Sequence, residues 1–384
     1  MITIQIADHR QAIQFPATVS DSPVSADDVT EGWIGLFDGH SLYGWRAESE
    51  ANWRVENGVI CVDQGEPGLL RTTSQFDDFE LRLEFSSSDT TDSGVLLRTS
   101  PRPHDPASDC YEINISATDN RFVTGSLVER IAATAYPTTN DFNLLEVSVN
   151  QESIRVWING EAITDYVDPR PLGRGFIGLQ FAAGEARFRN IALRPLGLET
   201  LFNHQDLTGW LPHGESGFHA IVNESGDLTI AGAGYVESDG QLTNGIIQGK
   251  CLISAKGNSG VFFRCVPGQA MNGYESQIDN GFEADRTRPS NAGTGAIFRR
   301  TQARRIVSDD QLWFAKTIVV EGPHMSVWVN GYQVTDWSDQ RPPDDNPRRG
   351  RRLESGTIQL QGHDAETTVR FRELVSREMA PRRY

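Results

Sequence analysis

The segment YESQID, residues 274–279, places a polar side chain at every second position. Because side chains alternate between the two faces of a strand, Glu275, Gln277 and Asp279 would share one face. A carboxylate can exchange a proton with a substrate, and amide groups can bind hydroxyl groups. The same row is also what the solvent face of an ordinary sandwich sheet contains, so both interpretations stay open.

Arg264 and His363 are the other candidates in this half of the chain. Arg264 follows the apolar residues 261–263, where a guanidinium needs an acid or a ligand as its partner; a structural salt bridge is the alternative. His363 comes after a strand-like segment with apolar residues at alternate positions, and a histidine can change its charge near neutral pH. An ordinary surface histidine is the alternative there.

These candidates belong to the second of two copies of one sequence pattern. The matching segments are LFDGHSLYGW (36–45) and LFNHQDLTGW (201–210), SGVLLR (93–98) and SGVFFR (259–264), YEIN (111–114) and YESQ (274–277), and WING (157–160) and WVNG (328–331). The last matches drift in spacing, which places additional loop length in the second copy at 339–352. We therefore predict a lead-in over 1–31, a first domain over 32–195 and a second over 199–379.

The two copies differ in their polar residues. Where the second copy has Glu275, Gln277, Asp279 and His363, the first has Glu112, Asn114, Ser116 and Ala182. We therefore expect the second copy to be the active one and the first to be degenerate.

The elements that must position these residues are strands. Apolar and polar residues alternate over 79–85 and 145–149, and the Asn-Gly pairs at 159–160 and 330–331 are typical of hairpin turns. With 36 Gly, 18 Pro and no convincing helix of three turns, the chain is expected to be all-β, with two tandem jelly-roll sandwiches joined closely at 195–198.

Composition excludes several classes of protein. The formal charge of −17 argues against nucleic acid as a partner, and the basic residues at 348–352 read as a solvated loop. Phosphate-binding glycine motifs are absent, so no nucleotide cofactor is expected, whereas a structural calcium stays open because Asp-Gly turns are common. The four cysteines lack CxxC spacing and are expected to be free and buried.

Neither a signal peptide nor an apolar run long enough to span a membrane is visible. The sequence as given therefore predicts a cytoplasmic protein.

The segments LFNHQDLTGW, GNSGVFFR, YESQID, TGAIF, WVNG and LQGH resemble the ordered motifs of the 3-keto-disaccharide hydrolase family. The resemblance covers both halves and is stronger over 199–379. It implies a concanavalin-like or laminin-G-like jelly roll that cleaves glycosides whose sugar a partner oxidoreductase has oxidised at C3. Members of the family are often exported, whereas no signal peptide is visible in this sequence.

Carried onto this sequence, the resemblance implies that Glu275, Gln277, Asp279, Arg264 and His363 are pocket residues. Residues four apart on a strand are roughly 13 Å apart, so Glu275 and Asp279 are too distant for the carboxylate pair of a retaining glycosidase, which needs about 5 Å. In a 3-keto sugar, however, one base can remove the acidified C2 proton, and elimination at C1 followed by hydration would complete the cleavage.

We expect Glu275 or His363 to be the base and the other to be the acid, with Arg264, alone or with a divalent metal, stabilising the enolate. Gln277, Asp279 and Gln361 would hold sugar hydroxyls. Two rival interpretations remain: a non-catalytic pair of carbohydrate-binding modules, and a structural or adhesive module.

Overall fold

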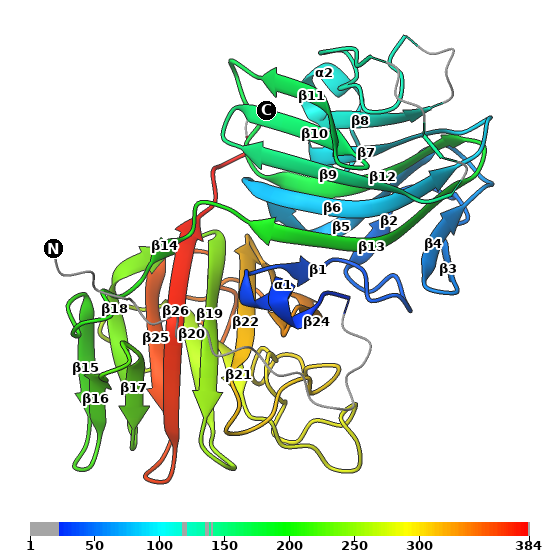
Figure 1. Cartoon of the computed structure of the whole chain (residues 1–384). Coiled ribbons are helices and arrows are strands. Elements are labelled where there is room, and N and C mark those ends of the chain that lie inside the picture. The colour runs from blue at the N-terminus through cyan, green and yellow to red at the C-terminus, as the bar shows by residue number, and fades with distance from the viewer. Residues whose placement is uncertain (1–22, 117–120, 135–137, 140, 383–384) are drawn as a thin grey trace, which may run out of the picture.

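Two β-sandwiches make up the chain, as Figure 1 shows. The computed structural model describes residues 23–116, 121–134, 138–139 and 141–382. Within these residues the helices are α1 (Ala26–Thr30) and α2 (Pro106–Asp109), and all other regular elements are strands. The prediction of two tandem all-β sandwiches is therefore confirmed.

Each sandwich pairs a large sheet with a five-stranded sheet, and the two copies repeat one topology. In the first copy the large sheet has the order β11 (Glu161–Val167), β10 (Ser153–Ile158), β9 (Asn143–Asn150), β6 (Phe79–Ser87), β13 (Ala186–Pro195), β4 (Val59–Val62), β3 (Arg54–Glu56), with β1 (Ile34–Gly35) on β13. Its five-stranded sheet is β2 (Trp45–Ala47), β5 (Gly68–Phe76), β12 (Gly175–Ala183), β7 (Asp92–Thr99), β8 (Tyr111–Ser116).

The second copy has the corresponding sheets. The large sheet is β16 (His219–Val222), β17 (Leu228–Ala231), β26 (Thr368–Glu378), β19 (Gly245–Ile253), β22 (Phe314–Glu321), β23 (His324–Val329), β24 (Tyr332–Ser338), with β14 (Glu199–Thr200) on β26. The five-stranded sheet is β15 (Trp210–Gly214), β18 (Gly234–Leu242), β25 (Gly356–Gly362), β20 (Ser259–Cys265), β21 (Tyr274–Ile278).

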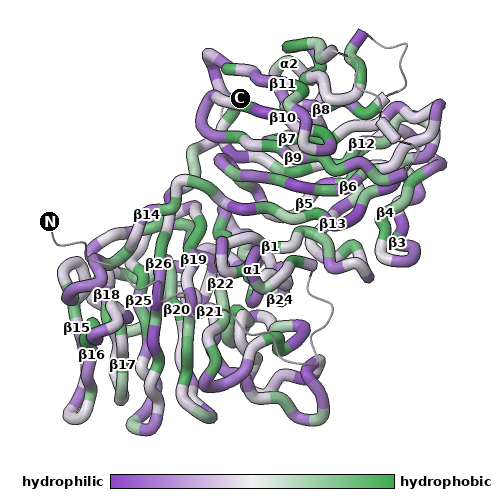
Figure 2. Tube along the Cα trace, in the orientation of Figure 1, coloured by the Kyte–Doolittle hydropathy of each residue, from purple (hydrophilic) through white to green (hydrophobic). Residues whose placement is uncertain are grey.

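Alternating residues build the two cores. Along β6, Phe79, Leu81, Leu83 and Phe85 are each at most 1% exposed, while the residues between them face outward. Figure 2 shows hydrophobic and hydrophilic residues following one another along the strands of both sandwiches. Burial of the apolar rows between the paired sheets supplies the main stabilisation of each copy.

Hairpin turns form at both predicted Asn-Gly pairs. Asn159 and Gly160 have φ angles of 51° and 81°, and Asn330 and Gly331 have φ angles of 48° and 74°. Adjacent positive φ angles are the signature of the type I′ turn, which Asn followed by Gly adopts at little cost.

The second hairpin also joins the two copies. The main-chain N–H of Gly35 donates to the carbonyl of Gly331 at 2.8 Å, and the indole of Trp328 donates to the carbonyl of Gly35 at 2.8 Å. Trp328 is only 1% exposed and packs against Phe76 of the first copy. The sandwiches therefore abut through a buried contact.

The described part of the lead-in, from residue 23, forms α1 beside β1. All four cysteines are free and buried, as expected. In the described part of the chain, no helix is long and apolar enough to cross a membrane.

Candidate active site

The candidate site lies on the outer face of the five-stranded sheet in the second copy. Gln277 pairs with Gly260 across β21 and β20, and Glu275 pairs with Phe262 in the same ladder. Phe262 in turn pairs with Gln359 of β25, so the rungs of three strands align. Tyr274, Ser276 and Ile278 alternate with these residues and are at most 2% exposed. The polar row predicted for YESQI therefore exists, and it faces away from the core.

A cavity of about 470 Å³ lies over this face. Its floor comes from β25, β20 and β21, and its walls come from the segments around 271, 299 and 348. The lining residues are Asn258, Phe262, Met271, Gly273, Tyr274, Glu275, Gln277, Ile297, Phe298, Arg299, Arg300, Arg348, Gln361 and His363. Of the six residues singled out from the sequence, Glu275, Gln277, Gln361 and His363 are brought together here.

Glu275 is the carboxylate of this cavity. Burial raises its pKa to about 7, against the opposing charges of Lys316, Arg299 and Arg348. The neighbouring strand leaves space for it, because a Cβ on Gly260 would lie 2.5 Å from Glu275 Oε1. A carboxyl group that titrates near neutral pH is suited to exchange protons with a substrate.

Two amide side chains, those of Gln277 and Gln361, line the same space. Gln277 donates through Nε2 to Asn258 Oδ1 at 3.2 Å, and Gln361 donates through Nε2 to Met271 Sδ at 3.2 Å. The Oε1 atoms of both glutamines are buried and have no hydrogen-bond partner among the described residues. Since buried polar atoms are usually paired, these oxygens are suited to accept hydrogen bonds from a ligand.

His363 lines the cavity at a different corner from Glu275. Its side chain is 46% exposed, and its Nδ1 lies 3.0 Å from Asp364 Oδ2. Glu275 shares a rung with Gln359, which lies four residues before His363 on a strand two positions away. These offsets correspond to roughly 13 Å along the strands and roughly 10 Å across them. The two residues are therefore well separated along the main chain, although both side chains line the same cavity.

Arg264 lies outside the cavity lining. A β-bulge interrupts the register after Phe262, and Arg264 adopts a φ of 50°, which turns its side chain out of the alternating pattern. The guanidinium is fully buried and donates to the carbonyls of Thr243 at 2.8 Å and Gly322 at 2.6 Å. The bulge therefore gives Arg264 a structural role, and this geometry does not support the expectation that it binds the substrate or its enolate.

The first copy supports this structural role. Arg98, at the end of β7, has a φ of 48° and donates to the carbonyls of Asp77 and Leu172. Both copies thus use a bulged arginine to satisfy carbonyl groups at one end of the sandwich.

We predict that Arg264→Met destabilises the chain by about 3 kcal/mol, because buried carbonyls lose their charged donor. Urea unfolding measures this loss, with Arg98→Met as the matched change in the first copy. The prediction would be contradicted by a variant with native stability and no affinity for ligand, since that result would return Arg264 to the site.

Asp279 also lies outside the cavity lining, since β21 ends at Ile278 and the strand alternation stops there. Its Oδ1 accepts from the N–H of Gly281 at 2.9 Å, and its Oδ2 accepts from Asn291 Nδ2 at 3.0 Å. Both carboxylate oxygens thus stabilise a loop. The expectation that Asp279 holds a sugar hydroxyl is not met in this geometry.

Three arginines of the cavity were missed in the sequence: Arg299, Arg300 and Arg348. The basic residues near 348 read as a solvated loop, yet Arg348 reaches the carbonyls of Ala270 and Met271, each at 2.9 Å. The signal available was the additional loop length of the second copy. The sequence does not show that this loop folds over the sheet, which is what brings Arg348 into the cavity.

Lys316 of β22 was missed as well. Its Nζ is buried beneath β21 and donates to the carbonyls of Ser276 at 2.8 Å and Gln277 at 2.7 Å. Burial lowers the pKa of Lys316 to about 7. The lysine therefore holds the strand that carries Glu275, from the core side of the sheet.

The first copy keeps part of the same arrangement. Glu112 and Asn114 of β8 pair with Leu96 and Gly94, and Gly94 pairs with Gln180 of β12. Burial raises the pKa of Glu112 to about 7. Glu112, Asn114 and Gln180 thus occupy the positions of Glu275, Gln277 and Gln361, whereas Ala182 corresponds to His363.

No group of three or more His, Cys, Asp or Glu side chains that could hold a metal ion occurs within the described ranges.

No curated protein matches the sequence. Among solved structures, a Parabacteroides distasonis protein proposed to be a glycosyl hydrolase is similar at 16% identity and a TM-score of 0.41, over 45% of this chain and 98% of that one. A second such protein from Parabacteroides distasonis has 19% identity and a TM-score of 0.37, over 47% and 99%.

A Bacillus subtilis carbohydrate-binding module is similar at 14% identity and a TM-score of 0.32, over 39% of this chain and 95% of that one. Each of these structures has about the length of one copy.

The sequence profile of one family matches both copies. The family is described as the 3-keto-alpha-glucoside-1,2-lyase-like domain, and it matches residues 32–194 and 197–375. These two matches cover most of the chain and follow the repeat that the sequence and the sheets display. The chain therefore belongs to the 3-keto-alpha-glucoside-1,2-lyase-like family and contains two tandem copies of its domain.

Proposed function

We propose that the second copy is an enzyme that cleaves the glycosidic bond of 3-keto-glycosides by elimination across C1 and C2, followed by addition of water. The observation that carries the proposal is Glu275, a carboxyl group with a pKa of about 7 in a cavity that also presents two unpartnered amide oxygens. The family description names a lyase that acts across positions 1 and 2, which agrees with an elimination.

In the first step Glu275 is the base. The C3 carbonyl acidifies the C2 proton, so the Glu275 carboxylate can take that proton while the electron pair of the C–H bond moves to form an enolate. The enolate then expels the substituent at C1: the C1–O bond breaks, a C1–C2 double bond forms, and the leaving oxygen takes up a proton. Water adds to C1 and a proton returns to C2, which yields the free 3-keto sugar.

The other lining residues bind the sugar and balance its charge. Gln277 and Gln361 would accept hydrogen bonds from its hydroxyl groups through their free Oε1 atoms. Arg299, whose charge lowers the pKa of Glu275, would stabilise the enolate in place of Arg264. His363 would contact the sugar at the opposite corner or relay a proton through water.

The substrate chemistry implies a partner reaction. Sugars do not carry a carbonyl at C3 unless an oxidation has placed it there, so an oxidoreductase acting on C3 of the glycoside must supply the substrate.

The proposal is tested by incubating the purified chain with 3-keto-trehalose and with unoxidised trehalose. We expect reducing sugar from the keto compound alone, and loss of deuterium from C2 of a labelled substrate into solvent. His363→Ala tests the second corner of the cavity, and EDTA followed by added calcium tests a divalent metal.

The rival candidate is a non-catalytic carbohydrate-binding module. It is favoured by the same two acceptor oxygens, which would bind an unoxidised sugar equally well. Binding of trehalose without turnover of either compound would overturn the enzyme and support this rival.

A further inference from the structure

The cavity over β21 has two chemically different ends. Asn258, Gln277 and Gln361 form a neutral amide end, since Gln277 is hydrogen-bonded to Asn258 and Gln361 lies on the adjoining rung. The segments carrying Arg299, Arg300 and Arg348 form the other end. Glu275 lies two residues before Gln277 on β21; burial raises its pKa, and the nearby charges of Arg299 and Arg348 oppose that rise. A substrate cleaved at Glu275 would therefore have its sugar over the amides and its leaving group toward the arginines.

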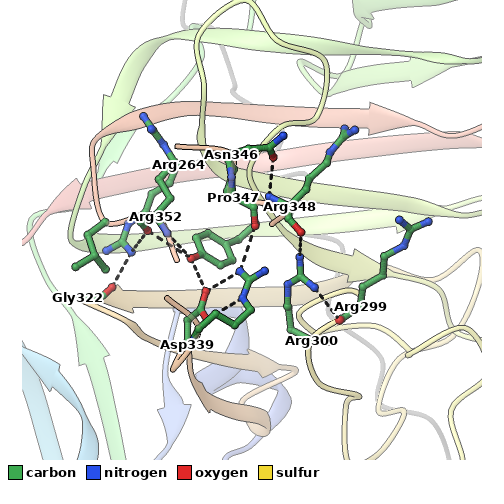
Figure 3. Close-up of polar contacts among 12 residues, drawn as sticks. Arg264, Arg299, Arg300, Gly322, Asp339, Asn346, Pro347, Arg348 and Arg352 are labelled. Atoms are coloured by element: carbon green, nitrogen blue, oxygen red, sulfur yellow. Dashed lines mark hydrogen bonds and ion pairs between the residues drawn. The ribbon is translucent and has the colours of Figure 1, made fainter. Parts of the chain in front are cut away.

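Carbonyl oxygens hold two of the three arginines, Arg300 and Arg348, and the guanidinium of Arg299 lies over the ring of Phe298. Arg300 donates to the carbonyl of Arg348 at 2.9 Å and to that of Arg299 at 3.2 Å, which joins the two walls of the cavity, as Figure 3 shows. Among the described residues none of the three forms an ion pair with a carboxylate, whereas the nearby Arg341 lies 2.7 Å from Asp339. No described carboxylate is therefore in direct contact with these charges, and Glu275 and Asp339 act on them only at a distance.

The positive charge of this cavity contrasts with the acidic composition of the chain. The protein carries a formal charge of −17, yet three arginines and a single carboxyl group, Glu275, line the cavity. A positively charged recess concentrates anions, and guanidinium groups bind carboxylates, sulfates and phosphates through paired hydrogen bonds. An enolate formed beside Glu275 would be stabilised by one arginine, Arg299, and the charges of Arg300 and Arg348 would remain for another anion.

The first copy has a counterpart for Arg300, which is Arg130, and differs at the other two positions. The N–H of Val128 donates to the carbonyl of Glu112 as the N–H of Phe298 donates to that of Glu275, so the next residues, Glu129 and Arg299, correspond. The charge at this position is therefore reversed between the copies. Arg348 comes from the loop that is longer in the second copy.

We propose that the leaving group of the substrate carries an anionic substituent, a carboxylate, sulfate or phosphate, which binds at the arginine end of the cavity. The inference rests on the proposed function and specifies the substrate class of that site.

The test compares 3-keto-glucosides of matched phenols that differ in one substituent: 4-carbamoyl, 4-carboxyl, 4-sulfo and 4-phosphono. We expect kcat/KM to be at least about tenfold higher for an anionic compound than for the carbamoyl compound, as a charged hydrogen bond would give. The three anionic arms identify which anion the arginines prefer. Added NaCl should reduce the preference, since salt screens exposed charges.

Arg348→Gln should lower the ratio of the two kcat/KM values about tenfold, and comparison of ratios removes differences in leaving-group reactivity. Thermal unfolding of the variant checks that it is folded. The salt dependence of the preference is measured on the wild-type chain, so it tests the proposal even if the variant does not fold. Equal kcat/KM values for all four compounds, at every salt concentration, would overturn the anionic substrate while leaving the proposed function standing. If no compound is cleaved, the proposed function fails, and calorimetric titration with the unoxidised 4-carboxyphenyl and 4-carbamoylphenyl glucosides decides the anion site separately.

Discussion

Replacing Glu275 by Gln is expected to lower kcat for 3-keto-glycoside cleavage by a factor of about 10²–10⁴, the usual contribution of a positioned base. The change keeps the shape of the side chain, so the contact with Gly260 and the position of β21 should persist. The amide cannot take the C2 proton. Single-turnover release of sugar measures the loss, and calorimetric titration should show that the variant still binds ligand.

The pH dependence of the wild-type chain checks the same role. Glu275 must be ionised to act as a base, and burial raises its pKa to about 7. We therefore expect kcat/KM to be low in acid, to rise through about pH 7 and then to level off. An activity that falls over this range would instead make the protonated form of Glu275 the active one.

Glu112→Gln is the matched control. Glu112 is the corresponding carboxyl of the first copy, and burial likewise raises its pKa to about 7. If Glu112→Gln abolished turnover and Glu275→Gln did not, the active copy would be the first.

Much of the fold was predictable because it depends on local patterns that repeat. The alternation over 79–85 matches the observed burial of β6, and both Asn-Gly pairs form the turns that their residues favour. The ordered matches between the copies required one topology twice, and the sheets confirm it. Strand alternation and turns depend on residues that are close in sequence, so a single sequence is enough to predict them.

The site was predictable only where strand alternation continued. Glu275, Gln277 and Gln361 line the cavity because β21 and β25 are regular at those positions. Alternation failed at Arg264, where a bulge with positive φ turned the side chain aside, and at Asp279, which follows the end of its strand. Neither irregularity leaves a mark in the residue types.

The remaining residues depend on contacts between distant segments. Arg348 lies in a loop whose path over the sheet cannot be read from its charge, and Lys316 interrupts an otherwise apolar strand whose partner sheet was unknown. A lysine inside such a strand was nevertheless a signal, since a buried ammonium group requires hydrogen-bond acceptors.

Replacing Lys316 by Leu is expected to shift the acid limb of the pH–rate profile to higher pH. The charge of Lys316 lowers the pKa of Glu275 across the sheet, so its removal should raise that pKa further. Activity at pH 6–7 should therefore fall, and it should recover at alkaline pH, where Glu275 is ionised in either form. Leucine suits the position, because the corresponding residue of the first copy is Leu145. The N–H of Asn159 donates to the carbonyl of Leu144, as the N–H of Asn330 donates to that of Ala315, so the next residues, Leu145 and Lys316, correspond.

The same variant should lose a pH-dependent penalty to the stability of the folded chain. Burial lowers the pKa of Lys316 from 10.5 to about 7, so the unfolded chain binds this proton more readily than the folded chain. The resulting reduction in the free energy of unfolding is absent above about pH 10.5. It grows as the pH falls toward 7, and it is constant below pH 7. In urea unfolding, the stability of Lys316→Leu relative to the wild-type chain should therefore be about 1–4 kcal/mol more favourable at pH 7 than at pH 10. The hydrogen bonds lost by the carbonyls of Ser276 and Gln277 lower its stability at every pH.

Lys256→Leu, a change at an exposed lysine, is the control and should alter stability by less than about 0.5 kcal/mol. An unshifted pH–rate profile in Lys316→Leu would mean that the lysine only holds β21 in place. A shift together with a relative gain in stability at pH 7 would show that the charge of Lys316 costs stability while it favours the ionised form of Glu275.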